Sequence, residues 1–172
     1  MQIYKLLSAL LDYPNQELLD HLPDLLEFIE QSPEIDAAER EALQHFIRRV
    51  QGQSLTDLQA DYVQTFDMTA EHSLHLTHHL FGDDKNRGPA LIDLGELYKD
   101  YGVEVVGNEL PDYLPLVLEF AAYMDDNEAT VFLSDAKKVL GVLTENLQKA
   151  ASPYAALLSI IDNRATLTKL AA

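Results

Sequence analysis

The sequence predicts an all-α fold, a single-domain helical bundle of about seven to nine helices over residues 1–172. Three observations favour this class. Apolar residues recur at the three- and four-residue spacing of a helix face along most of the chain. Alternating strand patterns are nearly absent, and 172 residues have the length of one domain with one contiguous core.

Amphipathic stripes place the expected helices in order along the chain. They predict helices with one buried face over residues 18–29, 43–50, 55–66, 91–101 and 132–147. The run 114–124 is apolar nearly all round, which indicates a central helix enclosed by others. A last helix is expected within residues 151–172. Residues 103–106 are strand-like, but four residues without a partner strand predict a loop.

The composition is strongly acidic. Twelve Lys and Arg stand against 29 Asp and Glu, which gives a formal net charge of −17. Such a surface repels nucleic acid and anionic membranes, and it suits a basic protein segment. No segment resembles a signal peptide or a membrane span, so we expect no membrane insertion and a cytoplasmic location. The absence of cysteine excludes disulfides and thiolate metal sites.

Four of the six histidines fall between His72 and His79, and they allow two interpretations. At helical spacing, neutral imidazoles could bind a transition metal. Alternatively, half-buried histidines could hydrogen-bond backbone carbonyls at an irregular helix joint. The second interpretation is favoured because no His-Glu-x-x-His motif and no Glu-x-x-His on another helix supplies further ligands.

A second group of polar residues surrounds an expected helix start. Glu109 and Asp112 flank this start, where carboxylates can accept the first free amides of a helix. Capping is therefore the favoured interpretation. The alternative is that Glu109, Asp112 and Glu119 line a groove for a basic ligand.

Motifs of catalysis are missing from the sequence. There is no phosphate-binding glycine loop, no Ser–His–acid combination, and no pair of carboxylates that stands out from the helix faces. We therefore expect that the protein is not an enzyme and that it carries no cofactor and no metal.

An ordered set of short segments resembles a known family. The segments are Tyr62-Val-Gln-Thr-Phe-Asp67, Ser73-Leu-His-Leu76, His79, Gly82-Asp83, Arg87-Gly88 and Glu109-Leu-Pro-Asp-Tyr-Leu-Pro115, with Tyr4-Lys-Leu-Leu-Ser-Ala-Leu-Leu-Asp-Tyr-Pro14 at the start. Together they resemble the respiratory nitrate reductase assembly chaperones, the delta subunit or NarJ type. This type belongs to the wider TorD-like group of molybdoenzyme chaperones.

The resemblance implies a TorD-like helical fold and a dedicated cytoplasmic chaperone. Such proteins bind the N-terminal segment of the unfinished catalytic (alpha) subunit of nitrate reductase, a basic amphipathic stretch. They hold this subunit open while the molybdenum cofactor is inserted, and they delay its docking to the membrane anchor. The cofactor-insertion machinery is a further candidate partner.

The motif residues form our hypothesis for the peptide-binding site. The expected contacts are Tyr62, Phe66, His75, His79, Asp83, Glu109, Asp112, Tyr113, Leu116 and Glu119. In this hypothesis Asp83, Glu109 and Asp112 contact Lys or Arg of the target, and the histidines tune affinity with pH. Arg87, Gly88 and Pro111 are expected to be structural, with Arg87 holding its loop through neighbouring acids.

Two other functions stay open on the sequence alone. One is a small helical metal protein built around His72, His75, His78 and His79. The other is an acidic adaptor for a different basic partner.

Overall fold

The all-α class is confirmed. The computed structural model describes residues 1–167; the end of the expected last helix, residues 168–172, lies outside the described part. The helices are α1 (Gln2–Leu11), α2 (Gln16–Gln31), α3 (Ala37–Gln51), α4 (Leu55–Tyr62), the π-helical turn η1 (Val63–Asp67), the 3-10 turn η2 (Ala70–His72), α5 (Leu76–Phe81), α6 (Arg87–Asp100), α7 (Leu114–Ala121), α8 (Asp126–Ser134), α9 (Lys137–Lys149) and α10 (Ala155–Arg164). Residues 1–167 contain no strand.

Ten α-helices within the described residues exceed the expected seven to nine. One cause is the stripe at 132–147, which crosses two helices, because α8 ends at Ser134 and α9 begins at Lys137. Another is Asp125, whose side chain caps the start of α8 just after the apolar run. The stripes also did not single out α1, which begins at the second residue.

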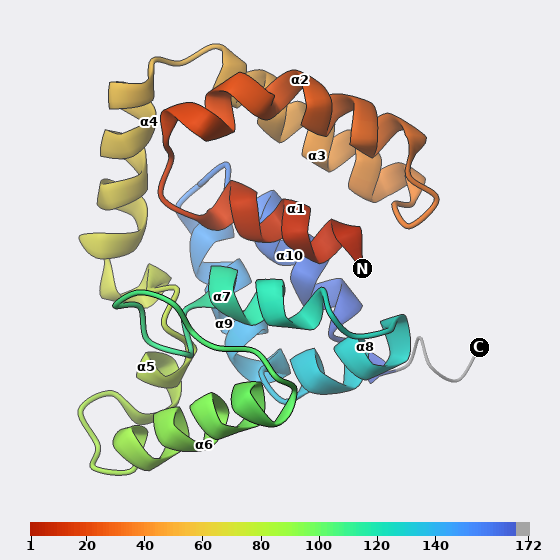
Figure 1. Cartoon of the computed structure of the whole chain (residues 1–172). Helices are drawn as coiled ribbons and strands as arrows, with labels where there is room; N and C mark the ends of the chain where they lie inside the picture. Colours follow the sequence, from red (N-terminus) through yellow and green to blue (C-terminus); the bar gives the residue numbers. More distant parts are fainter. Residues whose placement is uncertain (168–172) are drawn as a thin grey trace.

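The helices stack around α1 and α7 (Figure 1). The antiparallel pair α2 and α3 lies on one side of α1, and α7 packs along its other side. Behind them in this view, α9 and α10 pack against each other, and α10 also contacts α3. From the end of α3, α4 runs along the edge of the bundle toward η1 and α5 (Figure 1).

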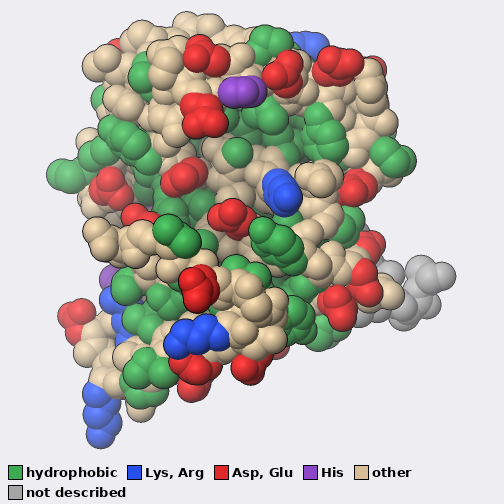
Figure 2. Space-filling view, viewed as in Figure 1, with side chains coloured by type: hydrophobic (Ala, Val, Ile, Leu, Met, Phe, Trp, Pro, Cys, Tyr) green, Lys and Arg blue, Asp and Glu red, His purple; other side chains and the backbone are tan. Residues whose placement is uncertain are grey.

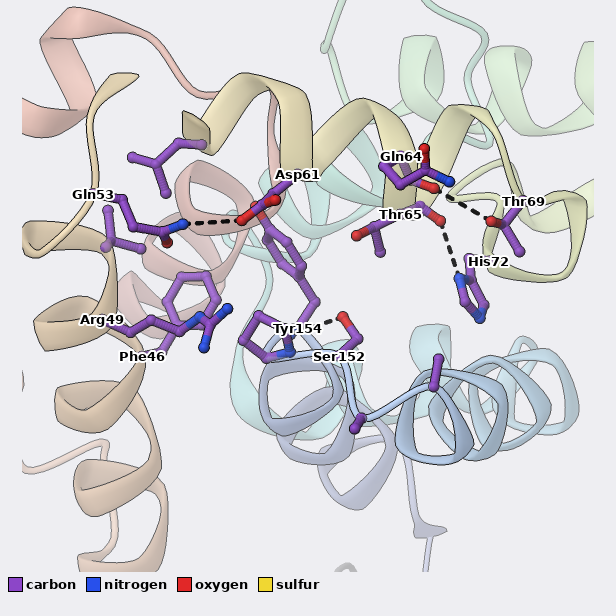
Figure 3. A pocket seen from close by; sticks show the side chains of 15 residues that line it. Phe46, Arg49, Gln53, Asp61, Gln64, Thr65, Thr69, His72, Ser152 and Tyr154 are labelled. Atoms are coloured by element: carbon purple, nitrogen blue, oxygen red, sulfur yellow. Dashed lines mark hydrogen bonds between the residues drawn. The ribbon is translucent and has the colours of Figure 1, made fainter. Parts of the chain in front are cut away.

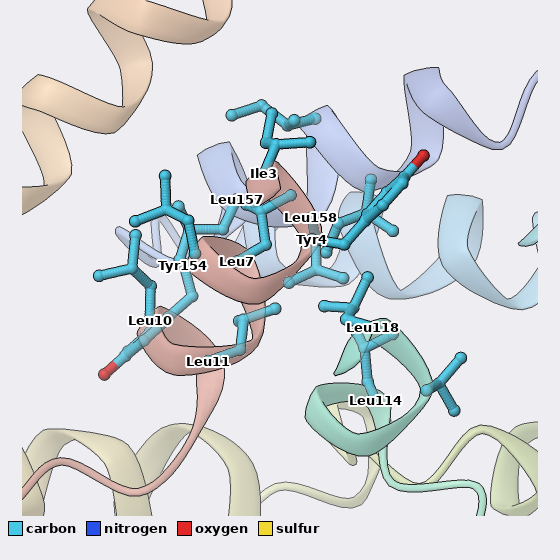
Figure 4. Packing of buried hydrophobic residues seen from close by; sticks show 14 of the residues in the cluster. Ile3, Tyr4, Leu7, Leu10, Leu11, Leu114, Leu118, Tyr154, Leu157 and Leu158 are labelled. Carbon is cyan, nitrogen blue, oxygen red and sulfur yellow. The ribbon is translucent and has the colours of Figure 1, made fainter. Parts of the chain in front are cut away.

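Leucine side chains fill the centre of the bundle (Figure 4). Buried residues of three helices meet there, namely Tyr4, Leu7 and Leu11 of α1, Leu114 and Leu118 of α7, and Leu157 and Leu158 of α10. Burying each such side chain contributes about 1.5–3 kcal/mol. The expected central helix is therefore confirmed as α7, with Pro115 in its first turn, where proline is tolerated.

The loop after α6, residues 101–113, returns across the start of α5. The Leu114 amide donates to the Leu74 carbonyl over 2.8 Å, and the Leu76 amide donates to the Asp112 carbonyl over 3.1 Å. An isolated antiparallel bridge between His75 and Tyr113 joins the same segments. The expected loop at 103–106 is confirmed, and its continuation is fixed beside η1 and α5.

Candidate functional site

A cavity of about 460 Å³ opens where η1, the segment around η2 and the end of the 101–113 loop meet. Five of the ten expected peptide contacts line it, namely Tyr62, Phe66, His75, Glu109 and Tyr113. The other lining residues were not among the expected contacts: Tyr13, Asp67, Ala70, Ser73, Leu74 and His78. Four of these, Tyr13, Asp67, Ser73 and Leu74, belong to the motif segments, so the segments account for more of this lining than the selected residues alone.

Aromatic rings form much of the cavity wall. Tyr62 lies between Tyr13 and Phe66, with ring centroids 5.6 and 4.9 Å apart respectively. His75 and Tyr113 face each other on the loop side, 5.3 Å apart. Tyr62 and Phe66 are each only 4% exposed, so the more exposed rings of Tyr13, His75 and Tyr113 supply most of the apolar surface that another side chain could contact.

Hydroxyl groups fix this wall in place. The Tyr62 hydroxyl donates to the Leu11 carbonyl over 2.9 Å and lies 2.7 Å from the Tyr113 hydroxyl. The Tyr113 hydroxyl in turn donates to Oδ1 of Asp12 over 3.1 Å. Burial raises the pKa of both tyrosines further above the ordinary value of 10.0, so these two hydroxyls stay protonated and can donate throughout the neutral range.

The π-helical turn separates an apolar from an acidic side chain at the cavity. In η1 the Met68 amide donates to the Val63 carbonyl over 3.0 Å, a reach of five residues that accommodates one extra residue in the helix. Phe66 is thereby buried in the wall, whereas its neighbour Asp67 is exposed at the rim. Glu109, from the loop, is exposed on the same cavity.

Asp112 departs from both expectations made for it. Its side chain is 1% exposed, so it does not reach a ligand in the cavity. It does cap a helix, but the helix is α5 and not α7, since Oδ2 accepts from the Thr77 amide over 2.9 Å and from the Thr77 hydroxyl over 2.6 Å. Burial alone would raise the pKa of Asp112, but hydrogen bonds from His75 and Thr77 outweigh burial and lower it.

Of the three residues predicted to be structural, Arg87 and Pro111 make hydrogen bonds within the fold, although Arg87 has a different partner from the one expected. Its Nε donates to the neutral Thr77 hydroxyl over 3.0 Å, and among the described residues it forms no ion pair with the neighbouring acids that we expected to hold it. The Pro111 carbonyl accepts from the Tyr98 hydroxyl over 2.7 Å, which ties the loop to α6. Gly88 is exposed in the first turn of α6.

The remaining expected contacts lie outside the cavity lining. Asp83 and Glu119 are exposed, and Leu116 packs partly buried against the core. Nε2 of His79 lies 2.7 Å from the Ser73 carbonyl, and Nδ1 of His72 lies 3.0 Å from the Thr65 carbonyl. The prediction that histidines of this cluster bond backbone carbonyls at an irregular joint is therefore confirmed.

A comparison with protein families identifies the family to which the chain belongs. The family described as "Nitrate reductase delta subunit" matches residues 32–159, which include η1, η2, α5 and the whole 101–113 loop. The chain belongs to the nitrate reductase delta subunit family. The resemblance seen in its motifs is confirmed.

Curated relatives in this family are named as chaperones. The chain is 35% identical to the "Nitrate reductase molybdenum cofactor assembly chaperone NarJ" of Escherichia coli K12, over 91% of its own length and 66% of that protein. It is 34% identical to the "Probable nitrate reductase molybdenum cofactor assembly chaperone NarJ" of Bacillus subtilis, over 92% of its own length and 85% of that protein. It is also 31% identical to the probable chaperone NarW of E. coli K12, over 91% of its own length and 65% of that protein.

The chain thus spans about two thirds of the length of the E. coli relatives. All three names describe assembly chaperones and none describes a catalyst, which agrees with the expectation that this delta subunit family member is not an enzyme. None of the described helices is both long and apolar enough to cross a membrane. Within residues 1–167, no three His, Cys, Asp or Glu side chains gather as the ligands of one metal ion would.

A second cavity of the delta subunit fold suits a basic ligand less well (Figure 3). It measures about 320 Å³ and lies between α3, α4 with η1, and the turn from α9 to α10. Gln53 donates to Asp61 over 2.9 Å inside it, and Arg49 also lines it. An arginine repels Lys and Arg, and the bonded Asp61 is less free to attract them, so we place the candidate site at the aromatic cavity instead.

Proposed function

We propose that this protein is a cytoplasmic assembly chaperone for respiratory nitrate reductase. It binds the N-terminal segment of the apo catalytic subunit, supports insertion of the molybdenum cofactor, and delays docking of the subunit to the membrane. Family membership supports the identity of the partner, because relatives carry the corresponding chaperone names.

The observation that carries the binding part of this proposal is the aromatic cavity with acids at its rim. A basic amphipathic helix can place apolar side chains against the more exposed rings, Tyr13 and Tyr113, which Tyr62 and Phe66 support from beneath. Its Lys or Arg can then lie beside Asp67 and Glu109. The net charge of −17 favours the approach of such a helix from a distance. Apolar contacts then supply affinity, and the charges supply orientation and speed of association.

Asp112 acts in this proposal as a positioning residue. Nδ1 of His75 lies 3.4 Å from its Oδ1, so the buried carboxylate orients a ring that lines the cavity. Arg87, which reaches the same Thr77 hydroxyl, supports the arrangement from α6. The cavity therefore keeps its shape in the absence of a target, which lowers the entropic cost of binding.

Calorimetric titration with a peptide of the catalytic subunit's first residues tests the proposal. We expect Glu109→Gln and Asp67→Asn each to weaken binding about two- to fivefold, the effect of losing one exposed charge pair. Glu104→Gln is the matched control, since Glu104 is exposed on the same loop but does not line the cavity. Equal affinity of all three variants and the wild type would contradict a site at this cavity.

A variant that fills the cavity mouth gives a stronger effect. Ala70 is exposed in η2 and lines the cavity, so Ala70→Lys adds bulk and a repelling charge where the target should lie. We expect binding to weaken at least tenfold, while Ala37→Lys, an exposed position on α3, leaves it unchanged. An unrelated basic amphipathic peptide of equal charge separates this function from that of a general acidic adaptor, because an adaptor would bind both peptides alike.

A further inference from the structure

A neighbouring cavity of about 300 Å³ lies between the end of α1 and the first turns of α2. Its lining residues are Ala9, Asp12, Tyr13, Asn15, Glu17, Leu18, His21 and Leu25. None of them was expected in the site, and only Tyr13 is shared with the aromatic cavity. This tyrosine is 46% exposed, so its ring separates two adjoining hollows at the protein surface.

Hydrogen bonds hold the segment that carries this ring. The Asp12 carboxylate accepts from the Tyr13 amide over 2.9 Å and from the Tyr113 hydroxyl over 3.1 Å. On the other side, Gln59 donates to the Pro14 carbonyl over 2.8 Å. Asp12 lines one cavity and Tyr113 the other, so their bond joins the walls of the two hollows. The backbone that carries Tyr13 is thus fixed, and its ring packs edge-on against Tyr62 as a ridge between the two hollows.

The two cavities both combine apolar surface with exposed acids, although the α2 side also carries the exposed His21. The α2 side offers partly buried apolar side chains, Leu18 and Leu25, and exposed acids, Asp12 and Glu17. The aromatic side offers rings and the exposed acids Asp67 and Glu109. Figure 2 shows hydrophobic side chains gathered between α2 and α1 with acidic side chains around them. A ligand that suits one cavity, apolar on one face and basic at its edges, therefore suits the other.

We propose that the target's N-terminal helix crosses the ridge at Tyr13 and occupies both cavities. This inference rests on the proposed function and extends its site onto α2. On one side of Tyr13 the helix meets the aromatic wall. On the other side it sets an apolar side chain against Leu18 and Leu25 and a Lys or Arg beside Glu17. The ridge contacts the helix between these two anchors.

A pair of adjacent leucines on α2 tests the extension. Leu25 lines the cavity beside α2, whereas Leu26 does not, and both are partly buried against the core. With the same peptide of the catalytic subunit, we expect Leu25→Gln to raise Kd about fivefold or more relative to Leu26→Gln. Glu17→Gln should raise Kd about two- to fivefold relative to Glu27→Gln, an exposed position farther along α2.

Hydrogen exchange supplies a readout that tolerates a loss of stability in either leucine variant. In the wild-type protein, the peptide should slow amide exchange in residues 17–25 as well as around η1 and η2. One combination of results overturns the extension alone. In it, Glu109→Gln weakens peptide binding, Leu25→Gln weakens it no more than Leu26→Gln does, and the peptide leaves amide exchange in α2 unchanged. A complete lack of binding to the wild type overturns the proposed function together with it. Self-association that Leu25→Gln abolishes would assign the α2 cavity to a second copy of the chain.

Discussion

The carboxylate of Asp112 caps the first turn of α5 from 35 residues away in the chain, through the amide and the hydroxyl of Thr77. The helix it caps has only six residues, too few to be stable by its own hydrogen bonds. One side chain of the returning loop therefore fixes both the start of α5 and the ring of His75. Asp112 should therefore affect both the stability of the fold and the shape of the proposed binding site.

Replacing Asp112 by Asn should lower the free energy of unfolding by about 1–3 kcal/mol. The amide keeps the volume of the side chain but leaves the Thr77 donors with a weaker acceptor in a buried site. Urea denaturation followed by circular dichroism measures the change. Asp83→Asn is the control, because Asp83 is exposed and its loss should change stability by less than about 0.5 kcal/mol.

The ionisation of Asp112 should also contribute to the pH dependence of stability. Its pKa is lowered on folding, so the unfolded chain binds a proton at this group more readily than the folded protein does. The stabilisation is present above the ordinary pKa of 3.8 and is lost as pH falls through the lower folded value. Between pH 5 and pH 3, wild type should therefore lose more unfolding free energy than Asp112→Asn. If the unfolding free energies of the two proteins fell in parallel with pH, the pH dependence would not come from Asp112.

The ion pair that joins α10 to α3 should be among the most sensitive sites of the fold. Nε and Nη2 of Arg164 each donate over 2.7 Å to the carboxylate of Glu39, and both side chains are about nine-tenths buried. We expect Arg164→Met to cost about 3–5 kcal/mol, because it leaves a buried carboxylate unpaired. The double variant with Glu39→Met should cost less than Arg164→Met, as chemical denaturation of both can show.

A more exposed ion pair is the natural comparison. Lys137 and Asp162 lie 2.7 Å apart, but their side chains are 39% and 21% exposed. Lys137→Met should therefore cost only about 0–1 kcal/mol, since solvent screens the pair. Similar losses for Lys137→Met and Arg164→Met would show that burial does not decide the difference.

Core packing around α7 gives a further prediction. Leu118 is fully buried between α1 and α10, so Leu118→Ala should lower the free energy of unfolding by about 2–5 kcal/mol through lost contacts and a residual cavity. Leu80, 55% exposed on α5, is the matched control, and Leu80→Ala should cost less than about 1 kcal/mol. Thermal unfolding of both variants measures the contrast.

Ionic strength should separate the two kinds of contact in the proposed complex. Added salt screens Asp67 and Glu109 at the rim, but it leaves the apolar contacts with the rings intact. We expect a lower association rate at high salt and a dissociation rate that changes little. Stopped-flow or surface-based kinetics between about 50 and 500 mM NaCl would measure both. An equal effect of salt on the two rates would contradict this division.

The sequence predicted the helical class and the central helix because both depend on local periodicity. The motifs that resemble a family contain most of the residues that line the aromatic cavity, but whether a target binds there stays a prediction. The sequence did not predict the partners of Asp112 and Arg87. Asp112 meets Thr77 only after the 101–113 loop folds back, and Arg87 meets it only where α6 packs against α5. Such contacts are set by tertiary structure, and residue type alone favoured the nearest helix start and the nearest acids.

The cavity between α1 and α2 was missed for a related reason. Leu18 and Leu25 were assigned to the buried stripe of their helix, and the structure leaves both partly exposed beside the end of α1. A stripe tells which face of a helix is apolar, but not whether neighbouring helices cover all of it. That incomplete cover is what the proposed extension of the site depends on.

The π-helical turn at Val63–Asp67 also limits how this surface can vary. Each residue of an α-helix turns the chain by about 100°, so deleting one residue here would restore a regular helix and rotate the segments on either side of it by that angle. Phe66 would leave the wall it shares with Tyr62, and the segment around Leu74 and His75 would no longer meet the returning loop. Substitutions within the turn should therefore be tolerated more readily than any change in its length.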